Sequence, residues 1–436
     1  MTYSEEKEKV ILAGVWESAG GGSYDDFLHS MDELAELAAA CGKECAESFT
    51  QILDRCTTAL YLGSGKVEEI KEAAAEHGAQ RVILNDTLTP VQLRNLQKEL
   101  EIEVMDRTAL ILEIFRSRAR TREAKLQVEV ARLSYLKPRL IGMWEKQNRQ
   151  GGASGSMSSK GEGETQLEID RRTIDHRLAD MRRELKVVER ERRTQRKKRQ
   201  ASGIPLVALV GYTNAGKSTI MNSFVKSCSG EEKQVFEADM LFATLDTSVR
   251  RITGEKNHDF LLSDTVGFIQ KLPTGLVEAF RSTLEEVKEA DLILQVVDYS
   301  DPHYKDHMDT TLSTIAELGA GDVPMIIVYN KSDQRDDTAF PRRGPQVRGE
   351  NGRLCGSVFI SARQEESIDL LREVILEELY GSFTEETVTV PYSRGGELAA
   401  IMAHGEVLSQ EYLEDGIRLL VRSRSKAADD VKRGGF

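Results

Sequence analysis

The residues with the most specific chemistry form one glycine-rich run, Gly211-Tyr212-Thr213-Asn214-Ala215-Gly216-Lys217-Ser218-Thr219. An apolar stretch at Leu206–Val210, expected to be a buried strand, precedes the run, and a helical pattern at Lys217–Lys226 follows it. Backbone N–H groups of such a loop close around phosphate oxygens, and the helix N-terminus adds its dipole. Lys217 then reaches the β- and γ-phosphates, while the Ser218 hydroxyl binds Mg²⁺. The spacing therefore predicts a site for a nucleoside triphosphate.

Two later motifs complete the expected phosphate and metal contacts. Asp264-Thr265-Val266-Gly267 ends the next predicted strand, where it places a carboxylate near the metal and a backbone N–H near the γ-phosphate. Phe242-Ala243-Thr244-Leu245-Asp246 lies in the position of a switch whose threonine ligates Mg²⁺ and senses the γ-phosphate. An ordinary strand threonine is the alternative for Thr244. We predict that Lys217, Thr244 and Gly267 act in hydrolysis and that Ser218 and Thr244 hold the metal.

Two further motifs predict which base is bound. Asn330-Lys331-Ser332-Asp333 follows the predicted strand Met325–Tyr329. The Asp333 carboxylate can accept hydrogen bonds from N1–H and N2–H₂ of guanine, whereas adenine leaves it unpaired, a difference of roughly 1.5–3 kcal/mol. Ser361-Ala362, with Arg363 beside it, can present a backbone N–H to guanine O6. The four motifs in this order predict GTP as the substrate and GDP as the product.

Alternating strand and helix patterns must position these motifs, and they predict an α/β protein. Residues 203–382 are expected to form a Ras-like P-loop GTPase domain with a mainly parallel sheet. Residues 1–115 predict a separate α/β domain, and residues 383–436 a small α+β module of the βαβ type. Strands of the first domain are expected at Val10–Val15, Ala59–Leu62, Arg81–Leu84 and Glu103–Met105.

A basic segment at residues 116–202 separates the two α/β regions. Between Arg116 and Gln200 there are 24 Lys and Arg residues against 12 Asp and Glu, although the whole chain has a net charge of −13. Heptad-spaced apolar residues predict an antiparallel helical hairpin, and the Gly/Ser-rich stretch 150–163 predicts a mobile loop at its tip. Such a hairpin favours a polyanion such as RNA as partner. A spacer between domains and a solvated helix end are the alternatives.

Composition excludes several classes of protein. The chain is 40% hydrophobic and 30% charged, which is typical of a globular protein. No run approaches the ~18 apolar residues of a membrane-spanning helix, and the N-terminus lacks a secretory signal. The five cysteines are scattered without a Cys-x-x-Cys pair, which argues against a disulfide framework or a structural zinc. We expect a cytoplasmic monomer with no stable membrane insertion.

These motifs, taken with Gly151-Gly152 and the stretch from Gly161 through Gly-Glu-Thr-Gln-Leu-Glu to Arg172, resemble those of the HflX family of ribosome-associated GTPases. This family belongs to the TRAFAC class of P-loop proteins, and the resemblance spans roughly residues 5–382. It implies that the protein binds the large (50S) ribosomal subunit and its rRNA, dissociates stalled ribosomes and hydrolyses GTP with Mg²⁺. The glycine-rich loop, longer and richer in serine than the expected family form, would point toward the peptidyl-transferase region.

Two departures from a Ras-like enzyme shape the expected mechanism. Phe268 stands where such an enzyme carries the glutamine that orients the attacking water. An apolar side chain cannot do this, so we expect slow turnover that the ribosome accelerates. An asparagine at the place of Asn214 holds a monovalent cation in several related GTPases, so K⁺ is expected to stimulate more than Na⁺. The alternative is that Asn214 hydrogen-bonds within its own loop.

A second glycine-bearing turn, Gly63-Ser64-Gly65-Lys66, could bind a phosphate of ATP or RNA. It lacks the full phosphate-loop spacing, and a tight turn with an exposed Lys66 is the favoured interpretation. Two other functions remain open at this point. The first is a GTP-gated RNA-binding factor in maturation of the large subunit, and the second is an adaptor or regulator of a membrane-associated protein.

Overall fold

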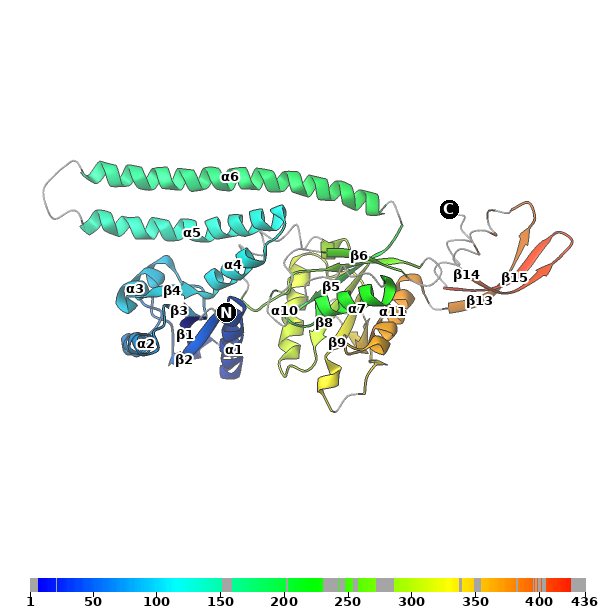
Figure 1. Ribbon diagram of the computed structural model, residues 1–436, viewed down its shortest axis with the longest axis horizontal. Helices are drawn as coiled ribbons and strands as arrows, with labels where there is room; N and C mark the ends of the chain where they lie inside the picture. The colour runs from blue at the N-terminus through cyan, green and yellow to red at the C-terminus, as the bar shows by residue number, and fades with distance from the viewer. Residues whose placement is uncertain are drawn as a thin grey trace, which may run out of the picture. The chain divides into compact units, whose positions relative to one another are not determined.

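The computed structural model describes residues 7–20, 22–150, 159–200, 203–229, 242, 248–253, 258–271, 286–336, 339–348, 354–381, 383–394, 396, 398, 401 and 405–424 (Figure 1). The chain divides into two compact units. Unit 1 comprises Met1–Arg193, Ala238–Asp246 and Ile269–Ser282, and unit 2 comprises Thr194–Glu237, Thr247–Phe268 and Thr283–Phe436. The two short inner segments of unit 1 fall inside the region 203–382 that the sequence predicts as one domain.

The first part of unit 1 is an α/β domain around a four-stranded sheet. The strand order is β2-β1-β3-β4, and every neighbouring pair is parallel. The strands are β1 (Glu8–Glu17), β2 (Lys43–Leu53), β3 (Arg81–Leu84) and β4 (Glu103–Asp106), and the helices are α1 (Tyr24–Ala40), α2 (Ser64–His77), α3 (Pro90–Leu100) and α4 (Arg107–Arg118).

The predicted strand at Ala59–Leu62 is wrong. These residues lie in a turn closed by a bridge between Thr57 and Tyr61, and the missing strand is β2. β2 lies at the edge of the sheet, and most of its side chains are exposed or half-buried. Its sequence therefore lacks the continuous apolar run that marks a strand buried on both faces.

Local signals start and stop the helices that cover this sheet. The capping box of Thr89 and Gln92 opens α3, Pro90 occupies its first turn, and Glu101 in the left-handed region (φ 60°) ends it. Apolar side chains of the strands and helices join in one buried core that includes Ile11, Leu62, Ile70, Val82 and Leu96. This core holds the carboxyl ends of the parallel strands in fixed positions.

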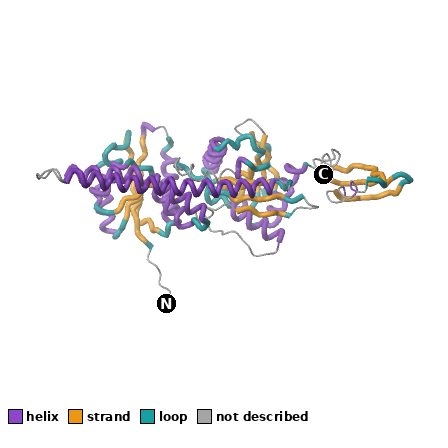
Figure 2. The backbone as a smooth tube through the Cα atoms, turned by 90° about the horizontal axis from the view of Figure 1, so that it is seen from above, coloured by secondary structure: helices purple, strands orange, loops and turns teal. Residues whose placement is uncertain are grey.

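A long helical hairpin, α5 (Arg122–Gln150) and α6 (Ser159–Gln200), follows the α/β domain (Figures 1 and 2). Leu178 of α6 packs with Val130 and Leu133 of α5, as the heptad spacing predicts. Residues 151–158 lie outside the described residues. The predicted loop 150–163 is too long at its C-terminal end, because α6 already begins at Ser159. Two glycines there cost about 1 kcal/mol each, which a long helix can absorb.

Unit 2 contains an eight-stranded, mainly parallel sheet. Its main path is β10-β12-β9-β8-β5-β7-β6, and β11 pairs with β12. Strands β5, β7, β8, β9 and β12 are parallel, whereas β6, β10 and β11 are antiparallel to their neighbours. The strands are β5 (Leu206–Gly211), β6 (Ser248–Ile252), β7 (Phe260–Asp264), β8 (Leu292–Asp298), β9 (Met325–Asn330), β10 (Arg342–Arg343), β11 (Val347–Arg348) and β12 (Leu354–Phe359).

Helices α7 (Lys217–Ser229), α10 (Tyr304–Glu317) and α11 (Glu365–Tyr380) pack on this sheet (Figure 1). The fully buried Phe224 of α7 and Leu371 of α11 join the strand residues in a single core. The mixed α/β fold with a parallel sheet confirms the predicted fold class. Because β5, β7, β9 and β12 are parallel, the motifs that follow them share one edge of the sheet.

The C-terminal strands do not form the predicted βαβ arrangement. β13 (Phe383–Pro391), β14 (Gly405–Tyr412) and β15 (Gly416–Arg424) make a three-stranded antiparallel sheet in the order β13-β15-β14. The sequence prediction missed β14, whose side chains are nearly all exposed. The short turn before Gly416 brings β14 back antiparallel to β15, and it excludes a crossover connection. Among the described residues, no helix is both long enough and apolar enough to cross a membrane.

Candidate nucleotide-binding site

The phosphate loop connects β5 to α7, as predicted. Gly211 adopts φ 153°, and a Cβ there would lie 2.2 Å from the carbonyl oxygen of Val296. Gly216 adopts φ 93°, and a Cβ there would lie 2.2 Å from Nδ2 of Asn330. Asn214, between them, is also left-handed (φ 60°) and exposed. Both glycines are therefore required by space and by backbone conformation.

Lys217 is buried within this loop, with 6% of its surface exposed. Its Nζ donates hydrogen bonds to the backbone carbonyls of Gly211 (3.0 Å) and Tyr212 (2.7 Å). Burial lowers the pKa of the ammonium to about 8, although the nearby Asp264 carboxylate acts in the opposite direction. The buried ammonium has only neutral carbonyls as hydrogen-bond partners. Binding of an anion such as a phosphate would therefore be favourable here.

Ser218, an expected metal ligand, lies at the C-terminal end of the phosphate loop. Ser218 Oγ donates to Oδ2 of Asp264 at 2.7 Å, and Asp264 is fully buried at the end of β7. Hydroxyl and carboxylate oxygens are the ligands that Mg²⁺ prefers in proteins, so these two residues fit the ion. Thr265, next in the chain, donates its hydroxyl to the Leu209 carbonyl (2.7 Å) and so has a structural role.

The segment Thr265–Phe268, which follows β7, lies against the phosphate loop. Thr213 N donates to Phe268 O (2.8 Å), and Phe268 N donates to Gly211 O (3.1 Å). A Cβ on Gly267 would lie 2.9 Å from Thr213 Cγ2 and 3.1 Å from Lys217 Nζ, so only glycine fits. Val266 is buried beside it. The structure thus brings together Gly267 and Lys217, two of the three residues predicted to act in hydrolysis.

The side chain of Phe268 is turned away from the loop. It is 3% exposed and packs in an apolar cluster with Val210, Val287, Ile293 and Ile315. A water molecule cannot be oriented by this side chain, because it is apolar and enclosed by other apolar groups. No histidine occurs in the phosphate loop or in Asp264–Phe268 that could replace it.

Asn330 ties the base-binding end to the phosphate loop. Its Nδ2 donates to Ala215 O (2.9 Å), and its Oδ1 accepts the Ala362 N–H (2.9 Å). The Ser361 N–H donates to Ser367 Oγ (3.1 Å). The predicted N–H from Ser361 or Ala362 to guanine O6 is therefore already used within the protein. Arg363, the next residue of this turn, is exposed.

Lys331 and Asp333 stand at the turn after β9. Lys331 is left-handed (φ 58°), and its Nζ forms an ion pair with Asp298 at 2.7 Å. Ser332 fixes the turn, because its N–H donates to Ile360 O and its hydroxyl to Tyr329 O. The Asp333 carboxylate is exposed and accessible to a base. Asp298 was not among the predicted site residues, although it directly follows the largely apolar run Leu292–Val297, which is a usable signal.

Most of the predicted switch segment Phe242–Asp246 cannot be compared with the prediction. Thr244, Ala243, Leu245 and Asp246 lie outside the described residues. Phe242, predicted to contact the nucleotide, is 2% exposed and lies edge-to-face on Phe115 of α4, with ring centroids 4.6 Å apart. Both aromatic residues belong to unit 1. Phe242 is therefore a core residue of unit 1, and the prediction that it binds nucleotide is corrected.

The second glycine-bearing turn, at the start of α2, is a structural turn. The Gly63 N–H donates to Gln51 Oε1 (2.9 Å). Lys66 pairs with Glu69 at 2.5 Å and lies over the ring of Phe49. Its charge is therefore already neutralised, which supports the turn interpretation, and nothing in the structure supports ATP binding there.

Comparison with known proteins agrees with this site. Three family models match, described as the N-terminal domain of a GTP-binding GTPase (residues 28–116), its middle region (118–199) and a 50S ribosome-binding GTPase (206–331). Curated relatives named GTPase HflX are 40% identical in Lacrimispora saccharolytica, over 95% of this chain and 93% of theirs, and 42% in Alkalihalophilus pseudofirmus, over 93% and 91%.

A more distant relative of the same name, from Escherichia coli K12, is 35% identical over 93% of this chain and 92% of its own. Among solved structures, a GTP-binding protein from Sulfolobus solfataricus in complex with GDP is 22% identical, with a TM-score of 0.41, over 84% of this chain and 98% of its own. The identity and coverage of the curated relatives are decisive. This chain belongs to the HflX family of GTPases and is a GTP-hydrolysing enzyme.

Proposed function

We propose that this protein uses GTP and Mg²⁺ to bind the large ribosomal subunit and to dissociate stalled ribosomes in the cytoplasm. The observation that carries the proposal is the cationic face of the α6 helix, on a chain whose residues 206–331 match a family described as 50S ribosome-binding GTPases. Exposed cations on this face are Arg171, Arg172, Arg182, Arg183, Lys186 and Arg190. Their density suits the phosphates of rRNA.

Hydrogen bonds from the middle of α5 attach the hairpin to the α/β domain of unit 1. The fully buried Asp106 carboxylate accepts four hydrogen bonds, from Leu88 N (3.0 Å), Ala109 N (2.8 Å), Tyr135 OH (2.8 Å) and Arg139 Nη2 (3.0 Å). Tyr135 and Arg139 belong to α5, and the guanidinium lies 3.4 Å from the tyrosine ring centroid. Because Asp106 also caps α4, one carboxylate links the strand, the loop and both helices.

At the nucleotide, the proposed roles combine the contacts described above with the sequence motifs. Lys217 places positive charge on the β- and γ-phosphates, and the Gly267 N–H faces the γ-phosphate. Asp333 selects guanine, and the Arg363 N–H serves O6. Ser218 and Thr244 would hold Mg²⁺ with Asp264 nearby, and the ion would neutralise charge on the phosphate oxygens. Because Phe268 cannot orient water, a group from the ribosome completes the site.

Asn214 supports the proposal of a monovalent cation. It is exposed at the surface of the loop, where a cation could reach it, and its backbone is left-handed (φ 60°). We expect faster hydrolysis in KCl than in NaCl with ribosomes present. Equal rates would leave Asn214 with a purely structural role in its turn.

The proposed function is tested by incubating ribosomes with the protein and GTP, GDP or a non-hydrolysable GTP analogue, followed by sedimentation. Separated subunits with the protein on the large one, in the GTP and analogue samples only, are expected. Binding restricted to immature large-subunit precursors would instead favour a GTP-gated maturation factor. Failure to sediment with any ribosomal particle would contradict the proposal and favour the adaptor function.

A further inference from the structure

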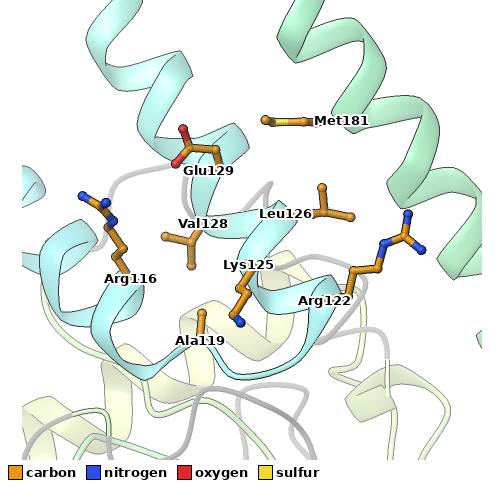
Figure 3. A pocket seen from close by; sticks show the side chains of 8 residues that line it. All are labelled: Arg116, Ala119, Arg122, Lys125, Leu126, Val128, Glu129 and Met181. Carbon is orange, nitrogen blue, oxygen red and sulfur yellow. The ribbon is translucent and has the colours of Figure 1, made fainter.

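A pocket in unit 1 lies beside the turn that joins α4 to α5, and the nucleotide site does not use it. Its volume is about 680 Å³, within the range of small-ligand sites. Residues of α4, α5 and α6 contribute to it (Figure 3). The lining residues are Arg116, Ala119, Arg122, Lys125, Leu126, Val128, Glu129 and Met181.

The charges around the pocket are predominantly positive and only partly neutralised. Arg116 and Lys125 are exposed, and neither forms a salt bridge with another described residue. Arg122 pairs with Glu184 of α6 at 2.7 Å. The carboxylate of Glu129 accepts two hydrogen bonds from Arg132, at 3.0 and 2.9 Å.

Glu129 therefore offsets only part of the pocket's positive charge. Arg132 is the main cause that holds the pKa of Glu129 below its usual value, and the charges of Arg116 and Arg177 act in the same direction. A carboxylate that is ionised and already bonded to its own arginine leaves Arg116 and Lys125 available to an anion.

The position of these cations along the helix supports a bound anion. Thr121 Oγ1 caps α5 by accepting the Ala124 N–H (3.1 Å), so Arg122 and Lys125 lie in the first turn. Positive side chains are unfavourable there, because the helix dipole already places partial positive charge at its N-terminus. A phosphate bound in this pocket would interact favourably with the side chains and with the helix end together.

The remaining lining is apolar. Val128 is 2% exposed and forms part of the pocket wall. Figure 3 shows Met181 extending from α6 toward α5, above Leu126. Apolar side chains next to unpaired cations suit a ligand with a flat apolar face and a phosphate, which is the chemistry of a nucleotide.

We propose that this pocket receives one unpaired nucleotide of a single-stranded RNA. The base lies on Leu126 and Met181, and the flanking phosphates contact Arg116 and Lys125. This inference rests on the proposed function, since the cationic face of α6 belongs to the same hairpin and would hold the rest of the strand. Duplex RNA is a poor ligand here, because stacking hides the faces of paired bases.

The test measures binding of fluorescent single-stranded RNA decamers to the full-length protein by anisotropy, across a range of salt concentrations. The same RNA as a duplex, and free UMP and AMP as competitors, are measured in parallel. Lys125→Gln is compared with Lys98→Gln, which removes an equal charge from an exposed position on α3. We expect Lys125→Gln to weaken single-strand binding about tenfold and to reduce the salt slope by roughly one. Lys98→Gln should weaken it about twofold or less.

A second variant separates base contact from charge. Met181→Gln should weaken single-strand binding about threefold and leave the salt slope unchanged, because it alters only the apolar surface. Melting temperatures within a few degrees of wild type show that each variant is folded.

Three outcomes would overturn the pocket assignment. One is an equal loss of RNA binding for Lys125→Gln and Lys98→Gln, which would mean that the general positive charge of the protein, and not this pocket, binds the RNA. Another is equal weakening of duplex and single strand by Lys125→Gln. The third is competition by UMP or AMP at concentrations that match the RNA nucleotides, which would indicate a free-nucleotide site. Each of these leaves sedimentation with ribosomes intact, whereas failure of the proposed function would abolish that sedimentation.

Discussion

Two glycine-bearing turns, one in each unit, precede a helix with a lysine in its first turn, yet only one has the features of a phosphate site. In unit 2, Lys217 is buried and donates to two backbone carbonyls of its own loop. In unit 1, Lys66 pairs with Glu69, and 22% of its side chain is exposed. The difference shows that a phosphate site needs a loop long enough to enclose a cation whose charge no side chain has neutralised.

The largest expected effect separates these two lysines. Lys217→Ala should reduce GTP affinity and hydrolysis by about 100-fold or more, because it removes the positive charge that faces the phosphates in a buried site. Lys66→Ala should change neither by more than about twofold. Equilibrium binding of a fluorescent GTP analogue and phosphate release measure both variants. A large loss of GTP binding in Lys66→Ala would show that the turn in unit 1 also serves the nucleotide.

The next-largest effect concerns recognition of the guanine base by Asp333. The turn at Lys66 in unit 1 has no residue proposed for this role. Asp333→Asn should weaken GTP binding by about ten- to 100-fold, since the amide cannot accept both hydrogen bonds from guanine. Asp336→Asn, an equal change at an exposed position three residues later, is the matched control. Competition titrations with GTP, ATP and XTP measure the nucleotide preference of both variants. Unchanged GTP preference in Asp333→Asn would refute the assignment of the base site.

A smaller effect follows from the pKa of Lys217. Its value of about 8 lies below the ordinary 10.5, so the folded protein binds fewer protons than the unfolded chain between these pH values. Stability without nucleotide should therefore rise with pH in this window, and it should fall as the pH drops through 8. GDP affinity should change in the opposite direction. It should decrease about tenfold from pH 7 to pH 9, because the neutral amine of Lys217 binds phosphate poorly. Calorimetric GDP titrations test this, and a flat profile would contradict the assigned pKa.

The smallest effect is on the stability of unit 1. Lys66 and Glu69 form a partly exposed pair, so Lys66→Ala should lower the free energy of unfolding by less than about 1 kcal/mol. Urea denaturation measures the change. A loss of several kcal/mol would mean that the turn in unit 1 depends on this lysine more than its contacts indicate.

The sequence predicts the strand and helix that flank the phosphate loop, and the strands that end at Asp264 and Asn330, because the demands of these motifs are local. The phosphate loop needs two glycines, a lysine and a serine at fixed spacing, and the strand before it and helix after it have regular apolar patterns. The same holds for Asn330 and Asp333, which directly follow a buried strand. Physical constraints that act within ten residues leave a readable pattern in the sequence.

Features that depend on distant partners could not be predicted in this way. Strand β2 is an exposed edge strand with few apolar residues, and β14 is equally polar. Phe242 packs on Phe115, far away in the sequence, and its neighbours resemble a switch motif. The hydrogen bonds that the Ser361 and Ala362 N–H groups donate could not be predicted either. Their acceptors, Ser367 and Asn330, come into place only in the folded protein.

The central claim is that Lys217 and Gly267 form a site that Phe268 leaves incomplete until the ribosome supplies the missing group. Its most direct test is steady-state GTP hydrolysis in potassium buffer, with and without purified large ribosomal subunits. We predict slow turnover by the protein alone and an increase of at least about 100-fold with the subunits. Fast hydrolysis without ribosomes, or no increase when the protein is bound to them, would contradict the claim.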